Sequence, residues 1–206
     1  MKVVRFINSI FTSNSYILFF DGSDYVFIVD PGDSKPLIDW LNNNNRSLQG
    51  VLITHSHFDH IYGMNDLLDL YPDIEIYASK YAKDGMMSSK LNSSYYTENP
   101  FVVKCENINI VDEGDTIYLC KDIVANVIYT PGHNNDCLSF AIEKNLFTGD
   151  ALIPGIKVHT KSKYSNKTEA VNSIHRIIEQ FENDIIIWPG HSNNCLLGTI
   201  KQNKLI

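Results

Sequence analysis

The sequence has no long hydrophobic run and few cysteines. Its longest apolar runs, such as YILFF and DIIIW, are far shorter than the roughly 20 residues that cross a bilayer. Its four cysteines contain no CxxC pair and are too sparse for a disulfide scaffold. Polar residues interrupt the N-terminal segment, which therefore lacks the continuous core of a signal peptide. We predict no membrane span, buried reduced thiols and a cytoplasmic location.

Positive charge is also scarce. The chain has 17 Lys and Arg against 24 Asp and Glu, a formal net charge of −7. Binding to nucleic acid or to an anionic membrane surface would need a broad excess of basic residues, so neither partner is expected. With 206 residues, 44% of them apolar, the chain is predicted to form one globular domain over residues 1–206.

Apolar segments separated by turn residues predict strands and helices in both halves of the chain. A helix is expected from Ser34, as its cap, through the buried face of 37–41, and another over 61–71. A last helix is expected from Asn166, which has capping-box spacing to Glu169. Residues 80–100 have weak periodicity and many turn formers, which predicts an irregular segment near a cleft. Strands are expected at 2–6, 15–20, 24–30, 50–54, 74–79, 108–119, 122–130, 138–150 (a hairpin) and 184–188.

In each half of the chain, strands come first and are followed by a further strand and a helix. This order predicts an α+β fold, in which two mainly antiparallel sheets pack face to face with helices outside as four αβ/βα layers.

Histidine and aspartate gather just after apolar strands. The sequence THSHFDH occupies 54–60, and three further segments end at His133 (TPGH), Asp150 (TGD) and His191 (PGH). Five of the seven histidines belong to this set. The cluster at 54–60 alone would also suit a polar loop, but its recurrence beside glycine, which allows a tight turn, favours a metal site.

The local spacing within 55–60 suits metal binding. In extended backbone, residues two apart face the same side, so His55 and His57 can converge on one ion. As the chain bends into a helix, Asp59 and His60 can turn toward a second position. The helix N-terminus disfavours positive charge, which helps to keep His60 neutral, as a ligand must be.

These motifs resemble the metallo-β-lactamase-fold superfamily, and among its members the glyoxalase II-like (hydroxyacylglutathione hydrolase-like) thioester hydrolases. His-x-His-x-Asp-His at 55–60 is followed by His133, Asp150 and His191 in the family's order, and DPG at 30–32 matches as well. The resemblance spans nearly the whole chain and implies the metallo-β-lactamase fold. It also implies seven ligands: His55, His57 and His133 at a first metal, Asp59, His60 and His191 at a second, and Asp150 as a bridge.

Such a site would be a binuclear hydrolase centre. Two divalent ions can share a water and present it as bridging hydroxide at neutral pH, to attack an ester-like bond in a thioester, lactone or phosphodiester. Asp59 is expected to orient the hydroxide and to take its proton. Nitrogen and oxygen ligands fit zinc, iron or manganese, and the resemblance favours zinc.

The sequence around the site suggests a small substrate with an anionic part. Lys157, His159, Lys161 and Lys163 form a local positive patch after Asp150. A solvated loop is the plainer alternative for that segment. Tyr95 can offer a hydroxyl to a developing oxyanion, with ordinary packing as its alternative.

Other functions share these ligands. A persulfide dioxygenase-like oxidoreductase would use a single iron, a lactonase would differ mainly in its pocket, and a metal-dependent binding protein would lack turnover. A nuclease is disfavoured by the net acidity. An antibiotic substrate is not expected because the bridging position holds Asp150 rather than cysteine. Full-length members of the family bind glutathione with the help of a C-terminal helical region, whereas only a short segment follows PGH at 189–191, so glutathione recognition is left open. The oligomeric state is left open.

Overall fold

The computed structural model describes residues 1–105 and 107–204, and the chain divides into two compact units, Met1–Val111 and Asp112–Ile206. Within the described residues, each unit contains one mixed six-stranded sheet. None of the helices there is long and apolar enough to span a membrane.

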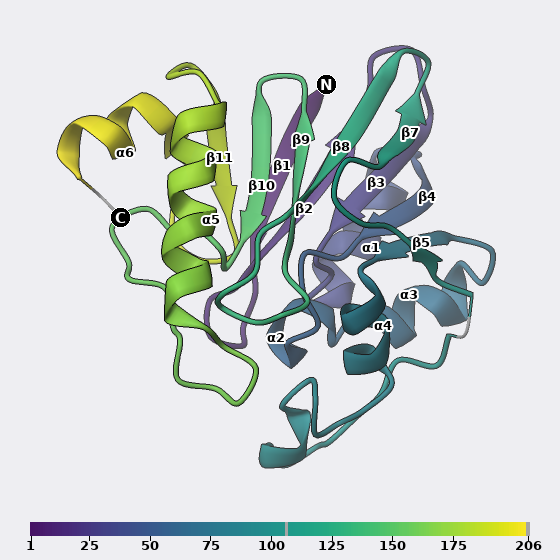
Figure 1. The fold of residues 1–206 in the computed structure, drawn as a ribbon. Coiled ribbons are helices and arrows are strands. Elements are labelled where there is room, and N and C mark those ends of the chain that lie inside the picture. The colour runs from purple at the N-terminus through teal and green to yellow at the C-terminus, as the bar shows by residue number, and fades with distance from the viewer. Residues whose placement is uncertain (106, 205–206) are drawn as a thin grey trace. The chain divides into compact units, whose positions relative to one another are not determined.

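The sheet of the first unit has the strand order β1-β2-β3-β4-β5-β6, and Figure 1 labels its strands β1 to β5. The β1–β2 and β2–β3 pairs are antiparallel, whereas the pairs from β3 to β6 are parallel. This sheet is therefore more parallel than the sequence suggested, because helices cross between its later strands and return the chain in the same direction. The strands are β1 (Lys2–Ile7), β2 (Asn14–Phe19), β3 (Tyr25–Val29), β4 (Ser47–Leu52), β5 (Glu75–Ala78) and β6 (Asn109–Ile110).

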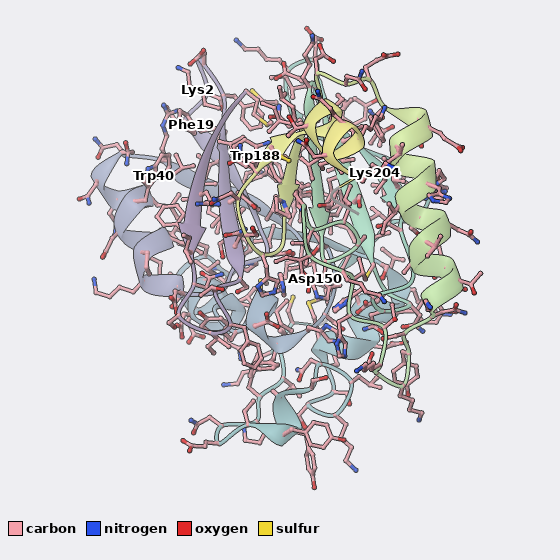
Figure 2. All side chains as sticks on the ribbon, turned by 90° about the vertical axis from the view of Figure 1, so that its left-hand side faces the viewer. Lys2, Phe19, Trp40, Asp150, Trp188 and Lys204 are labelled. Carbon is pink, nitrogen blue, oxygen red and sulfur yellow. The ribbon has the colours of Figure 1, made fainter. Side chains whose placement is uncertain are left out.

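Helices of the first unit bury their apolar residues against this sheet. Leu37 and Leu41, four residues apart on α1, are fully buried in one cluster with Val26 and Ile28 of β3. Trp40, also on α1, packs on Phe19 with ring centroids 5.4 Å apart (Figure 2). The helices are α1 (Ser34–Asn43), α2 (Phe58–Ile61), α3 (Met64–Leu70) and α4 (Lys80–Met86), with a 3-10 turn η1 (Ser94–Tyr96).

Two details of these helices differ from prediction. Ser34 is the first helical residue of α1 rather than its cap; Asp33 holds the cap position without a side-chain cap bond, because its carboxylate accepts hydrogen bonds from Ser9 instead. Residues 80–100 are not irregular throughout, since α4 covers the first seven. The Ser79 hydroxyl caps α4 by accepting a 3.0 Å bond from the Ala82 amide.

The second unit has the strand order β12-β11-β10-β9-β8-β7. All pairs are antiparallel except β10 with β11, and β9 with β10 forms the predicted hairpin. Asn166 caps α5 as predicted, accepting from the amides of Thr168 and Glu169. The elements are β7 (Thr116–Cys120), β8 (Ile123–Tyr129), β9 (Leu138–Ile142), β10 (Asn145–Gly149), α5 (Lys167–Gln180), β11 (Ile186–Pro189), β12 (Cys195–Leu196) and α6 (Leu197–Asn203).

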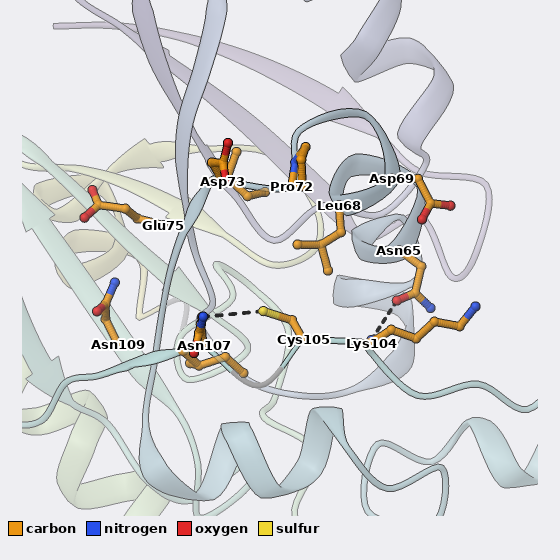
Figure 3. A pocket seen from close by; sticks show the side chains of 12 residues that line it. Asn65, Leu68, Asp69, Pro72, Asp73, Glu75, Lys104, Cys105, Asn107 and Asn109 are labelled. Atoms are coloured by element: carbon orange, nitrogen blue, oxygen red, sulfur yellow. Dashed lines mark hydrogen bonds between the residues drawn. The ribbon is translucent and has the colours of Figure 1, made fainter.

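The first unit also has an open, polar cavity of about 850 Å³ beside α3 and β5 (Figure 3). The side chain of Asn65 accepts a 2.9 Å hydrogen bond from the Lys104 amide, and exposed Asp69 and Glu75 lie on the wall. None of the predicted ligands lines this cavity.

Candidate metal centre

The first group of predicted ligands lies where β4 leads into α2. His55 is fully buried and His57 is partly buried. A nitrogen of each lies within 4.8 Å of a nitrogen of the other, and their rings are 4.9 Å apart. The structure thus brings these two imidazoles together, as their spacing in extended backbone led us to expect.

Asp59 and His60 form a second pair at the start of α2. The Asp59 Oδ2 atom is 3.5 Å from the His60 Nε2 atom, and the His60 ring is 4.2 Å from the His55 ring. Both residues of the pair are buried. The carbonyl of Asp59 is held by the Ser13 hydroxyl, which donates a 2.6 Å hydrogen bond to it. The turn into the helix therefore points adjacent residues toward one place.

Asp30 organises two of these histidines through hydrogen bonds. Its Oδ2 atom is 3.1 Å from His60 Nδ1, and the same oxygen accepts a 2.5 Å bond from the Thr54 hydroxyl. Because that hydroxyl gives its single proton to Asp30, it accepts from Nδ1 of His55 at 3.0 Å. Both imidazoles then carry their proton on Nδ1, which leaves the Nε2 lone pairs for a metal.

Asp30 is a buried carboxyl group whose pKa is changed by its surroundings. It is 2% exposed, and desolvation raises the pKa of its carboxyl group, while the hydrogen bonds from His60 and Thr54 oppose the rise. The sequence pointed to DPG at 30–32 only through family resemblance, and the contact with Thr54 was missed. The partners lie 24 and 30 residues away, so no local pattern could reveal them.

The turn after Asp30 needs glycine. A Cβ atom on Gly32 would lie 2.2 Å from Asn8 Nδ2, and the Gly32 amide donates a 2.9 Å bond to the Ser15 hydroxyl. The Ser15 hydroxyl in turn donates to the Asp30 carbonyl. A side chain at residue 32 would displace this buried network and Asp30 with it.

The remaining ligands gather in the second unit. His133 follows β8, while Asp150 and His191 follow the parallel neighbours β10 and β11, whose carboxyl ends meet at one edge of the sheet. The Asp150 Oδ2 atom is 3.5 Å from His133 Nε2 and 3.6 Å from His191 Nε2. One carboxylate oxygen therefore faces two imidazoles.

The orientation of His133 is set by its backbone neighbours. Its Nδ1 atom is 3.1 Å from the His159 carbonyl oxygen, so Nδ1 carries the proton and Nε2 has the lone pair facing Asp150. The Ser165 hydroxyl donates a 2.7 Å bond to the His133 carbonyl. At Gly132, φ is +136° and a Cβ atom would lie 2.2 Å from the Ala170 amide nitrogen, so only glycine fits.

These donors suit a metal ion. Ligands about 2.0–2.1 Å from a tetrahedral ion lie roughly 3.4 Å from one another, close to the separations of 3.5 and 3.6 Å around Asp150. Imidazole nitrogen and carboxylate oxygen are shared by zinc, iron and manganese sites. The separations around Asp150 therefore suit residues that share a divalent metal.

The predicted substrate residues are on the surface. Lys157, His159 and Lys161 are exposed in the loop that precedes α5, where the backbone of His159 has a role that the sequence did not suggest. Tyr95 is 52% exposed, and the Lys90 ammonium lies 5.3 Å from its ring. Its ring also lies 5.4 Å from the Tyr96 ring, so this tyrosine is partly packed and partly open to solvent.

Comparison with known proteins identifies the family of this chain. The model of the Metallo-beta-lactamase superfamily matches residues 9–191. A hydroxyacylglutathione hydrolase from Francisella philomiragia subsp. philomiragia is 33% identical over 93% of this chain and 68% of its own length. Another from Buchnera aphidicola subsp. Baizongia pistaciae is 30% identical over 93% of this chain and 66% of its own length.

This chain spans between about half and two thirds of the length of such curated relatives. The crystal structure of BLEG-1, described as a B3 metallo-beta-lactamase, matches with a TM-score of 0.89 and 26% identity over 98% of this chain and 97% of the other. The predicted α+β fold class is thereby confirmed. The curated relatives likewise confirm the prediction of a hydrolase enzyme that resembles the hydroxyacylglutathione hydrolases. The chain belongs to the metallo-β-lactamase superfamily.

Proposed function

We propose that the two units act as a single domain over residues 1–206 and that their ligands form one binuclear centre. The observation that carries this proposal is the position of Asp150 Oδ2 at similar distances from His133 and His191, as a bridging carboxylate requires. In the proposed centre, His55, His57 and His133 would hold a first metal, Asp59, His60 and His191 would hold a second, and Asp150 would be shared.

The proposed reaction is hydrolysis of an ester-like bond, with a thioester as the leading candidate. The relatives at 33% and 30% identity are named hydroxyacylglutathione hydrolases, and the donor set suits zinc, with iron or manganese as alternatives. Two such ions would supply a hydroxide nucleophile at neutral pH and polarise the substrate carbonyl.

The chain's own residues have distinct roles in this proposal. The Asp59 carboxylate would hold metal, orient the attacking oxygen and accept its proton. Asp30 keeps the proton of His60 on Nδ1, and the His159 carbonyl does the same for His133. These groups prepare the ligands before substrate arrives, so that little reorganisation is needed during reaction.

Substrate binding is proposed at the exposed groups around the site. Lys157, His159 and Lys161 suit an anionic part of a small substrate, and the Tyr95 hydroxyl suits a developing oxyanion. If Lys157→Ala combined with Lys161→Ala does not raise the KM for an anionic thioester, this assignment is wrong.

Metal analysis followed by an activity panel tests the proposed function. Purified protein with residues 1–206 should contain two metal ions per chain and hydrolyse a thioester faster than a lactone, a phosphodiester or a β-lactam. The β-lactam is included because of the similarity to BLEG-1. One iron per chain with oxygen consumption on a persulfide would instead indicate an oxidoreductase, and two metals without turnover would indicate a binding protein.

A further inference from the structure

A groove of about 600 Å³ in the first unit begins at Phe58, the residue between the proposed ligands His57 and Asp59. Phe58 is thus the groove residue that is next in the chain to two proposed ligands. Its wall is rich in aromatic side chains, and its volume is typical of a small-molecule site. The aromatic residues are Phe11, Phe58, Tyr62 and Phe101.

Phe11 leaves a large apolar surface open at this groove. Its side chain is 69% exposed, although its ring meets the Phe58 ring edge-on, with centroids 5.5 Å apart. Packing against Phe58 thus covers only part of the ring. Together with the other aromatic side chains that line the groove, this ring contributes to an apolar surface of the kind that marks ligand-binding grooves.

The loop that carries Phe11 is held in an uncommon conformation. Phe11 and Thr12 have φ values of 52° and 54°, which is unusual for any residue with a side chain and more so for a β-branched one. The Asn8 amide donates a 2.8 Å bond to the Ser13 carbonyl, and both the amide and the hydroxyl of Ser9 donate to Asp33. Such over-determined strain is common at ligand clamps, so the loop is built to present Phe11.

The opposite wall of the groove is tied to the metal-ligand motif. The Phe58 amide donates a 2.8 Å bond to the carbonyl of Asn92, which is fully buried. The Asn92 side-chain amide donates a 3.0 Å bond to the Phe101 carbonyl. One buried residue thus positions both the start of α2 and the wall at Phe101, which means that the groove is already formed in the absence of ligand.

The charge of the groove limits what it can accept. The charged side chains that line it, Asp66 and Glu98, are acidic, and its described lining includes no Lys or Arg. An anionic group such as the carboxylates of a peptide thiol would be repelled. In a thioester of such a thiol, the acyl group is the uncharged part.

We propose that this groove binds the acyl group of the substrate and selects an uncharged hydrocarbon or aryl acyl group over a short hydroxyacyl group. This inference rests on the proposed thioesterase activity. In that reaction, water adds to the carbonyl carbon, the carbon–sulfur bond breaks, and a carboxylic acid and a thiol are released. Each methylene buried in the groove can strengthen binding up to about fourfold.

A series of thioesters of N-acetylcysteamine tests the proposal in the metal-loaded protein. With acetyl, butanoyl, hexanoyl and octanoyl groups on one neutral thiol, kcat/KM should rise with chain length. Phe11→Ala should lower the octanoyl-to-acetyl ratio of kcat/KM at least about tenfold, because much of the aromatic wall is lost. Tyr81→Ala is the matched control, since Tyr81 is 53% exposed and lies outside the groove; it should keep the wild-type ratio.

A flat chain-length series in the wild type, or an unchanged ratio in Phe11→Ala, would overturn the proposal. A second series fixes the acetyl group and lengthens the thiol from ethanethiol to octanethiol. If the preference for length appears only in that series, the groove binds the leaving group and our assignment of the acyl group is wrong.

Binding without turnover separates this proposal from the proposed function. The S-octyl thioether of N-acetylcysteamine should bind the metal-free protein at least about tenfold more tightly than the S-ethyl thioether in calorimetry, and Phe11→Ala should remove the difference. If the protein binds the octyl compound but hydrolyses no thioester, the proposed thioesterase activity is wrong and the proposal that the groove binds a hydrocarbon group is kept. Thioester hydrolysis without octyl preference in either assay would refute the groove alone.

Discussion

Asp30 shows how one buried side chain can control several ligands. It contacts His60 directly and His55 through the Thr54 hydroxyl. The Thr54 amide also donates a 2.7 Å bond to the other oxygen of this carboxylate. Partners of this kind fix the tautomer and the ring orientation of metal-binding histidines, and their loss typically weakens metal binding 10–100-fold.

At the residue scale we therefore predict that Asp30→Asn weakens metal binding. Asparagine has the same shape and tolerates the positive φ of 51° at this position. Its NH2 group replaces one of the two carboxylate oxygens, however, and cannot accept the bonds made there, either those of His60 and the Thr54 hydroxyl or that of the Thr54 amide. We expect metal affinity to fall about 10–100-fold and kcat to fall with it, as measured by chelator competition and steady-state kinetics. Asp39→Asn, on the exposed side of α1, should change neither value. Equal affinity in Asp30→Asn and wild type would contradict this role.

At the element scale, α5 links helix capping to the site. The Asn166 amide donates a 2.8 Å bond to the Gly132 carbonyl, and the Ser173 hydroxyl donates a 2.7 Å bond to the Pro131 carbonyl. The first turns of α5 thus hold the backbone directly before His133. Loss of the hydrogen bonds at the N-terminus of α5 would affect both the helix and the backbone before His133.

We predict that Asn166→Ala lowers the free energy of unfolding by about 1 kcal/mol, within a range of roughly 0.5–2. The side chain of Asn166 satisfies two amides of the first turn, and alanine leaves both without that acceptor. Urea denaturation measures the change. Asn172→Ala, an exposed position within α5, is the control and should be neutral or slightly stabilising because alanine favours helix. Equal stability of the two variants would show that the cap contributes nothing.

The elements differ in how well local pattern predicts them. Helix α5 and the β9–β10 hairpin follow from periodicity and from Asn166, since capping and alternation act between near neighbours. Helix α4 was missed because buried Ala82 and Met86 are a weak signal in a segment that also contains Gly85. The parallel pairs β3 to β6 were missed because strand direction depends on where connecting helices return the chain.

At the scale of the whole molecule, metal should stabilise the protein through ligands from both units. A metal that binds only the folded chain at 1,000 times its Kd adds about 4 kcal/mol to the free energy of unfolding. At 2–4 °C per kcal/mol, Tm should therefore fall by roughly 10 °C when a chelator removes the metal and recover when zinc is restored.

Variants in each unit test whether both units contribute ligands to the metal. We expect His57→Ala and His133→Ala each to lose most of the metal-dependent gain in Tm. His175→Ala is the control, because His175 is exposed on α5 and lies outside the proposed ligand set. A full metal-dependent gain in His133→Ala would mean that His133 does not contribute to the stability that the metal provides.

The sequence by itself determined which residues could bind metal and in which order, because each candidate follows an apolar strand and the spacing of 55–60 places neighbouring side chains together. Tertiary structure decided what holds those residues in place. The partners of His60 and His133 lie 30 and 26 residues away, and the groove at Phe58 joins three distant segments of the chain. Contacts over such separations arise only when strands and helices have packed, so local sequence patterns contain no sign of them.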